Sequence, residues 1–435
     1  MTDRTTSPPP AGPSSAPPWR NRDFRLVWAG GLVNDLGDWL LIVALPLYVF
    51  TRTSSGGMTA LLFLVEMLPA VLIGRRAGRI VDRWDLRRTL IATNVLQAVM
   101  LLPLLAVTPD RIWPAFVVAA AQSVLTRFNN PAKIALLPRL VSTDRLVVAN
   151  SANAISDNIA RLAGAPLGGV LVEVVGLGGI VVADGVSFLL VAVATWAVRR
   201  DAGRPLAPRP VDPAGDPDEP PGAGRAAKLD IRRTRPLPAL LTTVLLGTFA
   251  QGLFLVLYLA FIVRKVVGDG TDVGVIRGMQ ALGGISGGLL VGRFARAVAP
   301  GRLTGVGYIG LAVVGAVTWN LPALTTAVGF YVVGFALAGV PIAALGVGTV
   351  TAAQRFTPPE HLGQLIGASD AVAAAGTALG TVPAGLLVDR IDVTTLLDGW
   401  AVLYVTAGVI ALLFVHRDPR EAGAATADRR MTSVA

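Results

Sequence analysis

Apolar blocks of about 20 residues recur along this chain, and they constrain its fold more than any other feature. A helix of that length crosses ~30 Å of hydrocarbon, because it rises about 1.5 Å per residue. Only 15% of the 435 residues are charged, whereas a typical soluble domain has about 25%. The sequence therefore predicts an all-α polytopic membrane protein.

Twelve such blocks are predicted to be transmembrane helices, at 24–50, 58–79, 88–107, 112–136, 147–172, 177–198, 237–263, 271–292, 302–319, 322–348, 362–388 and 397–415. They fall into two pseudo-symmetric six-helix halves, 24–198 and 237–416. Weak similarity between the halves supports this division, and pseudo-symmetric halves are typical of transporters with a binding site near the bilayer midplane. A disordered N-terminal tail (1–23), a polar linker (199–236) and a C-terminal tail (417–435) complete the expected organisation.

The basic residues indicate the orientation of these helices. If the N-terminus is cytoplasmic, 30 of the 38 Lys and Arg residues lie in cytoplasmic segments, five lie outside and three lie within spans. Because cytoplasmic loops of membrane proteins are rich in Lys and Arg, both termini and the linker are expected in the cytoplasm. The expected location is the inner (plasma) membrane of a bacterium, in contact with the lipid bilayer. Orientation also accounts for the net charge of +10 without a nucleic-acid partner.

Several classes of chemistry lack the residues that they need. The chain has no Cys and only two His, so disulfides and thiolate or imidazole metal clusters are not expected. No G-x-x-x-x-G-K-[ST] loop is present, which argues against an internal ATPase. We therefore expect no cofactor and no enzymatic activity.

The loop between the second and third spans carries a specific charge pattern. It reads G-x-x-x-D-R-x-x-x-R-R, and its residues are Gly78, Asp82, Arg83, Arg87 and Arg88. This pattern resembles the signature loop of the major facilitator superfamily, and the resemblance in span number, linker and orientation extends over essentially the whole chain. The resemblance implies a cytoplasmic gate, in which the Gly allows close helix approach and the Asp pairs with Arg and with a helix end. Asp85 stands where that family usually has Gly.

A similar run, Gly385-Leu-Leu-Val-Asp389-Arg390, follows the eleventh span. The predicted topology places it outside the cell. We therefore interpret this second run as a coincidence at a helix end.

The fifth span contains a cluster of small residues, at Gly164, Pro166, Gly168 and Gly169. Small residues permit close helix packing, and a proline inside a helix bends it. The cluster resembles a G-P-x-x-G-G stretch of superfamily exporters, with the proline displaced by one position. That resemblance implies a helix-packing motif associated with antiport, while ordinary packing is the alternative.

Charged residues inside the spans are the candidates for proton coupling. Each would cost roughly 2.5–3.5 kcal/mol at the bilayer centre if it faced lipid, so they are expected to pair or to line a cavity. The candidates are Asp35, Asp38, Glu66, Arg127, Asp157 and Arg161. Asp157 and Arg161 are spaced i, i+4 and can form a structural pair; Asp184, placed near a span end, is also interpreted as structural.

Asp35 and Asp38 are spaced i, i+3, so both can face one cavity, and two neighbouring carboxylates suit a group that loads and releases a proton. The surrounding Asn-Asp-Leu-Gly-Asp-Trp resembles the start of the enterobactin-exporter and macrolide-efflux branch of the superfamily. The sequence and this resemblance together favour a monomeric secondary active transporter. It would export a small amphiphilic molecule (a drug, siderophore or secondary metabolite) by proton antiport with alternating access.

Two other functions remain open. One is an importer that couples a nutrient to protons or sodium. The other, from a different class, is a non-transporting membrane receptor or assembly protein that uses the same fold.

Overall fold

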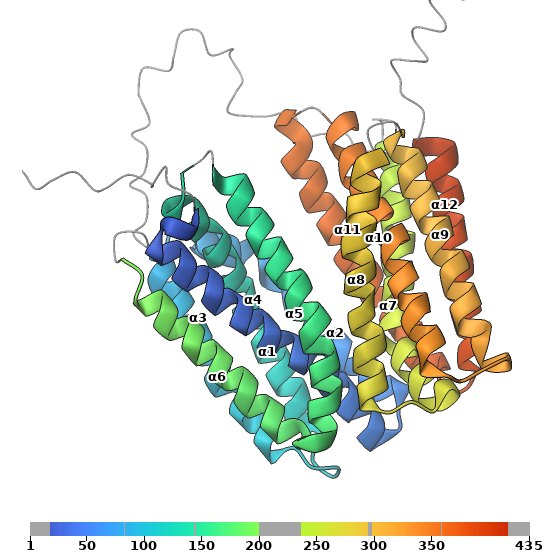
Figure 1. Ribbon diagram of the computed structural model, residues 1–435, viewed down its shortest axis with the longest axis horizontal. Coiled ribbons are helices and arrows are strands. Elements are labelled where there is room, and N and C mark those ends of the chain that lie inside the picture. Colours follow the sequence, from blue (N-terminus) through green and yellow to red (C-terminus); the bar gives the residue numbers. More distant parts are fainter. Residues whose placement is uncertain are drawn as a thin grey trace, which may run out of the picture. The chain divides into compact units, whose positions relative to one another are not determined.

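The computed structural model describes residues 18–81, 83–142, 145–199, 236–294, 298–357 and 359–415 (Figure 1). Within these ranges the chain forms twelve α-helices, and the only β-type pairing is an isolated bridge between Thr108 and Arg111. The all-α prediction is therefore confirmed for the described part of the chain. Most of the predicted tails and linker lies outside these ranges.

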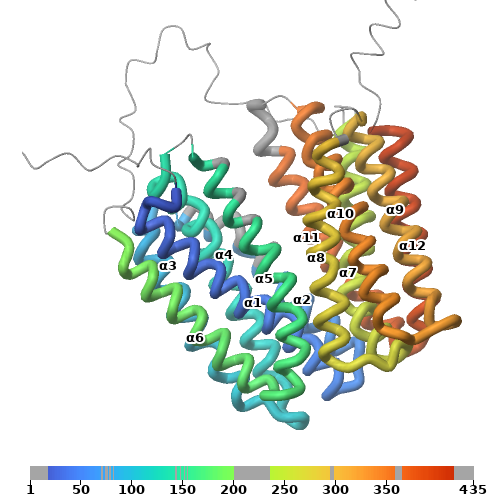
Figure 2. The backbone as a smooth tube through the Cα atoms, in the orientation of Figure 1, coloured from blue at the N-terminus to red at the C-terminus, as the bar shows by residue number. Residues whose placement is uncertain are grey.

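Within each set of six, the helices follow one another with short connections, as the tube in Figure 2 traces from blue to red. The first six are α1 (Arg22–Thr53), α2 (Gly56–Val81), α3 (Leu86–Leu101), α4 (Trp113–Leu140), α5 (Leu146–Val174) and α6 (Gly176–Trp196). The second six are α7 (Leu237–Phe261), α8 (Gly270–Phe294), α9 (Pro300–Asn320), α10 (Val328–Phe356), α11 (Pro359–Leu387) and α12 (Val393–Ile410). Short 3-10 or π-helical turns extend several of them, including η5 (Ile262–Val266) after α7.

Eight of these helices are long and apolar enough to cross a membrane, judged by the described residues alone. Three of them are the helices α1, α6 and α10. Four are α3, α7, α9 and α12, each together with the short helical turn that follows it, and the eighth is the Leu365–Leu387 part of α11. Of the other four, α2 contains a shorter apolar stretch, Gly56–Pro69, and polar and charged side chains lower the hydropathy of α4, α5 and α8. The described residues therefore contain twelve helices, of which eight meet the length and hydropathy expected of a span.

The described residues form two compact units. The first contains residues 18–45 and 68–199, and the second contains residues 46–67 and 236–415. The end of α1 and the start of α2 therefore group with the second six helices, although they belong to the first six in sequence. The two compact units therefore differ from the predicted halves, 24–198 and 237–416, which are divided at the linker alone. Both helices carry a proline close to the division, Pro46 in α1 and Pro69 in α2.

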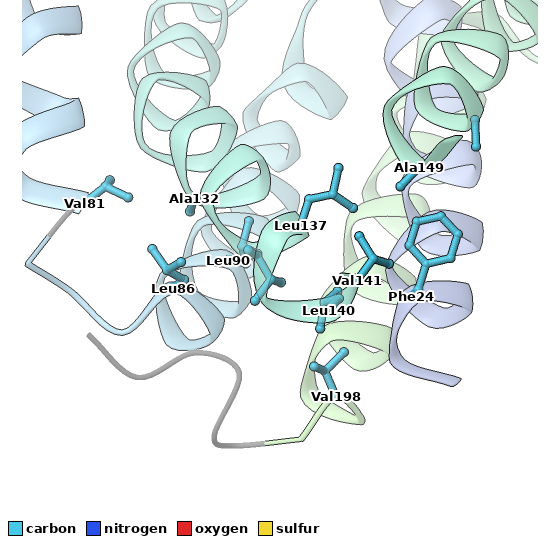
Figure 3. Close-up of a cluster of buried hydrophobic side chains, with 12 residues drawn as sticks. Phe24, Val81, Leu86, Leu90, Ala132, Leu137, Leu140, Val141, Ala149 and Val198 are labelled. Atoms are coloured by element: carbon cyan, nitrogen blue, oxygen red, sulfur yellow. The ribbon is translucent and has the colours of Figure 1, made fainter. Parts of the chain in front are cut away.

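A core of apolar side chains holds one end of the first unit together (Figure 3). Val81 and Leu86 flank the α2–α3 loop in it, and Phe24 joins it from the start of α1. Beside this core, Asp85 accepts a hydrogen bond of 2.8 Å from the backbone N–H of Arg88 and so caps α3. An Asp in this capping position stabilises a helix start by about 1 kcal/mol relative to Ala, which gives Asp85 a structural reason to replace the usual Gly.

Candidate functional site

Helices α1 and α6 approach each other closely at Gly37 and Asp184. A Cβ atom added to residue 37 would lie 2.5 Å from Oδ1 of Asp184 and 2.6 Å from Oγ of Ser187. Only a residue without a side chain allows this approach. As a result, the Asp184 carboxylate lies directly against the backbone of α1, one residue before Asp38.

Asp184 is only 1% exposed, and its two oxygens have different surroundings. The Ser187 hydroxyl lies 3.3 Å from Oδ1 and also donates to the Asp184 carbonyl at 2.8 Å, whereas Oδ2 has no hydrogen-bond partner. Leaving a buried polar atom without a partner costs about 1–3 kcal/mol, and more for a charged group. Asp184 lies in the middle part of α6, so its expected position near a span end is wrong.

Asp38 is half-buried on α1. Its Oδ2 accepts a hydrogen bond of 2.8 Å from Nδ2 of Asn34, one turn earlier on the same helix. Asp184 lies against the backbone at residue 37, next to Asp38, and Asp35, which pairs with Lys133, lies three residues before Asp38 on the same helix. The structure therefore collects three carboxylates and one ammonium group from α1, α4 and α6.

Lys133 supplies the cation of this cluster from α4. Its Nζ lies 3.4 Å from Oδ1 of Asp35, and the two side chains are 35% and 21% exposed. Sequence reasoning assigned Lys133 to the cytoplasmic charge bias, near the expected end of the fourth span. In the structure α4 continues to Leu140, and the contact with Asp35 places Lys133 against α1.

Helix α5 contributes a second set of polar side chains, which contacts Trp39 of α1. The Trp39 indole N–H lies 3.4 Å from Oδ1 of Asp157, and the Arg161 guanidinium lies over the indole ring, 5.4 Å from its centroid. Arg161 also lies 3.9 Å from Oδ2 of Asp157 and donates to Asn158 at 2.9 Å. The structure thus contains the i, i+4 pair, and Trp39 connects it to α1.

The glycines of the α5 cluster bring α5 against α1. A Cβ atom added to Gly164 would lie 2.7 Å from the Cβ of Trp39, and one added to Gly168 would lie 2.7 Å from the carbonyl oxygen of Leu40. Gly169 is buried as well, and Pro166 lies inside the helix. The cluster therefore positions the helix that carries Asp35 and Asp38.

The two remaining coupling candidates, Glu66 and Arg127, lie on α2 and α4. Glu66 is exposed on α2 and belongs to the second compact unit. Arg127 is half-buried in α4, and its Nε atom has no hydrogen-bond partner.

The predicted cytoplasmic gate motif is described only in part. Asp82 lies outside the described residues, and Gly78 lies within α2. Arg83 is exposed, while Arg87 donates to the carbonyls of Trp196 and, at 3.0 Å, Val198, just after α6. Arg87 thus satisfies carbonyl groups at the C-terminal end of a helix, where a positive charge is favourable.

Sequence reasoning missed three members of the cluster: Lys133, Asp184 and Ser187. The Asp184-x-x-Ser187 spacing places both side chains on one face of α6 and is a usable signal. The contact with Gly37 could not be found from one sequence, because nothing in the pattern says which helix α6 meets.

Membrane-crossing helices that carry buried charged side chains define the class of this chain as polytopic membrane proteins with a functional site inside the membrane. The chain belongs to the Major Facilitator Superfamily, whose family model matches residues 27–336 and 269–433. This finding confirms the resemblance to the superfamily that the sequence analysis stated. Proteins of this superfamily carry small molecules across membranes, so the chain is a membrane transporter.

Two bacterial relatives are similar to the chain in sequence. The MFS-type transporter YfiS of Bacillus subtilis is 24% identical over 416 residues, which cover 91% of this chain and 94% of YfiS. Macrolide efflux protein A of Streptococcus pyogenes is 24% identical over 179 residues, which cover 40% and 44% of the two chains.

Solved structures share the fold. A bacterial homologue of the iron transporter ferroportin, in an inward-facing state, matches with a TM-score of 0.74 and 16% identity, over 92% of this chain and 99% of that one. The nucleoside transporter NupG matches with a TM-score of 0.70 and 13% identity, over 90% and 99%. At these identities the likeness concerns the fold alone.

Proposed function

We propose that this transporter exports a small amphiphilic molecule in exchange for protons that move inward, by alternating access between its two six-helix halves. The observation that carries the proposal is the contact between α1 and α6, where buried Asp184 lies beside the helix that carries Asp38. The similarity to a macrolide efflux protein supports the outward direction. Protons, the substrate and the lipid bilayer are the proposed partners of a monomer in the bacterial inner membrane, with both termini cytoplasmic.

The chemistry of the cluster suits a proton as the coupling ion. Ser187 and Asn34 each satisfy one oxygen of a carboxyl group, and Oδ2 of Asp184 has no donor. Binding of one proton would reduce the negative charge of the three carboxyl groups and would remove the cost of leaving a charged oxygen without a donor. Lys133 lies against Asp35 and can offset the charge that remains after release.

The energetics permit export without ATP. One charge that crosses about 150 mV gains ~3.5 kcal/mol, since 100 mV is worth ~2.3 kcal/mol per charge. At about 1.4 kcal/mol per factor of ten, this supports a substrate gradient of a few hundredfold.

Inside-out membrane vesicles test the direction and the coupling together. An exporter accumulates its substrate in such vesicles when their interior is acidic, so a panel of amphiphilic dyes, macrolides and siderophores is assayed with and without a protonophore. We expect accumulation that the protonophore abolishes, and accumulation only in right-side-out vesicles would instead indicate an importer. Asp38→Asn and Asp184→Asn are expected to abolish proton-driven accumulation.

The matched control is Asp110→Asn, which changes an exposed carboxylate in the connection before α4. It is expected to transport like the unchanged protein. Normal proton-driven accumulation by both Asp38→Asn and Asp184→Asn would remove the cluster from the coupling role.

A further inference from the structure

The turn between α1 and α2 is held by residues that are distant in sequence. Helix α1 ends at Thr53, Ser54 has a φ of 51°, and α2 begins at Gly56. A positive φ is uncommon for a residue with a side chain, so the surroundings must hold this turn in place. All the contacts that do so lie within the second compact unit.

Asp389, just after α11, binds both a helix start and a cation. Its Oδ2 accepts the backbone N–H of Gly56 at 3.1 Å, and its Oδ1 accepts Nη2 of Arg264 at 2.6 Å. A carboxylate at a helix N-terminus is stabilised by the helix dipole, and a charge-assisted hydrogen bond is stronger than a neutral one. Asp389 thus joins the start of α2 to the end of α7.

Arg264 reaches the same turn from the π-helical η5. Its Nη1 donates to the Val388 carbonyl at 2.8 Å, and its Nη2 lies 3.5 Å from the Ser54 carbonyl. The guanidinium also lies over the Phe50 ring, 5.3 Å from its centroid. One side chain from η5 therefore contacts the end of α1, the turn and the end of α11.

Close packing accompanies these polar contacts. A Cβ on Gly56 would overlap the Val388 side chain, and a Cβ on Gly385 would overlap that of Ala60. The helices can therefore separate here only by breaking the whole set of contacts. The residues involved, Gly385 and Asp389, are the Gly and Asp of the G-x-x-x-D-R run that sequence reasoning set aside as a coincidence.

We propose that Gly56, Arg264 and Asp389 form a gate, the α1–α2 latch, which holds this end of the transport pathway closed and opens once in each transport cycle. The proposal rests on alternating access and does not depend on the substrate or the coupling ion. In the latch, Gly385 allows close helix approach, and Asp389 binds both a helix start and an arginine. The family resemblance implies these same two roles for Gly78 and Asp82 in the loop between α2 and α3.

A neighbouring ion pair provides a matched control. Lys265, next to Arg264, pairs with Asp392, which precedes α12. This second pair also connects the end of α7 to a loop after α11, but neither of its residues has a described contact with residues 46–67. Loss of Asp392 therefore removes a similar charge pair without touching the latch.

Because the chain has no native cysteines, spin labels attach only at cysteines that are introduced by mutation. Labels at Thr51→Cys and Ile391→Cys, both exposed positions, report the separation of the α1 end from the α11 end in nanodiscs. Without substrate, we expect a short distance to dominate, and Asp389→Asn to raise the population of a longer distance about fivefold or more, the range of a typical coupling between states. Arg264→Gln is expected to do the same, and Asp392→Asn to leave the distances unchanged.

Two results would overturn the latch. One is an unchanged distance distribution in both Asp389→Asn and Arg264→Gln; the other is an equal change in Asp392→Asn. Size-exclusion elution and the thermal unfolding midpoint of each variant establish that it is folded, and Arg264→Lys serves as a milder variant if Arg264→Gln does not fold. Because no substrate or proton gradient is used, failure of the latch is distinguishable from failure of proton-coupled export.

Discussion

Gly37 on α1 and Asp184 on α6 are in such close contact that any side chain at residue 37 would meet the Asp184 carboxylate. Asp184 is almost fully buried there, with one oxygen unpartnered. The glycine therefore determines how close a buried charge can come to the backbone beside Asp38. The first prediction tests this contact between Gly37 and Asp184.

Gly37→Ala is expected to lower both stability and transport. Overpacking a tight contact costs typically about 1–3 kcal/mol, because the helices must shift to admit the methyl group. The thermal unfolding midpoint and proton-driven accumulation are measured together. Gly185→Ala on α6 is the control, since a Cβ there meets nothing within 4 Å; equal behaviour of the two variants would contradict the contact.

The Asp157–Arg161 pair is expected to contribute little to stability. The Arg161 Nη2 and Asp157 Oδ2 atoms are 3.9 Å apart and the side chains are 30% and 55% accessible. Pairs that are accessible to water are typically worth about 0.2–1 kcal/mol. A double-mutant cycle with Asp157→Asn and Arg161→Gln measures the coupling free energy. A coupling well above ~1 kcal/mol would show that the pair is more than a surface contact.

Arg87 is expected to stabilise the end of α6. Arg87→Gln removes the charged donor from the carbonyls of Trp196 and Val198, and a hydrogen bond to a charged group is worth about 1.5–3 kcal/mol before its partial exposure is allowed for. Hydrogen exchange of the amides around residues 194–199 should become faster. Arg83→Gln, at an exposed side chain of the same loop, should leave that exchange unchanged; if the two variants behave alike, the contact has no stabilising role.

Asp392 is expected to make stability depend on acidity. The hydrogen bond from Lys265 holds the pKa of Asp392 below its usual value, helped by the backbone N–H of Thr394. The folded pKa is thus below the unfolded one, so the stabilisation is fully present above about pH 4, the usual pKa of Asp, and is lost as the pH falls through the folded pKa.

Unfolding midpoints between about pH 6 and pH 3 test this prediction. The unchanged protein should lose more stability on acidification than Asp392→Asn, which has no carboxyl group to protonate at this position. Identical pH profiles would exclude a contribution from the pair.

The apolar blocks were sufficient to predict the helical class and the order of the helices, because burial in a bilayer leaves a strong signal in composition. The family was indicated by the resemblance of the Gly78–Arg88 loop. Helix α4 extends beyond the expected span of 112–136 to Leu140. Lys133 lay within that span, but it was counted with the cytoplasmic charges, and its contact with Asp35 on α1 could not be predicted from the sequence. Asp184 was interpreted only as a structural residue, because its place in the cluster depends on its contact with Gly37 on another helix. Asp389 was set aside because local pattern and topology say nothing of its contacts with Gly56 and Arg264.

The prolines near the division between the compact units have a mechanical consequence. Pro46 and Pro69 lack an N–H, so the carbonyls of Ile42 and Val65 lose their usual partners within α1 and α2. Each helix is consequently less stiff at the point where it passes from one unit to the other. A helix without these hydrogen bonds bends more easily at the proline than in the hydrogen-bonded turns on either side of it.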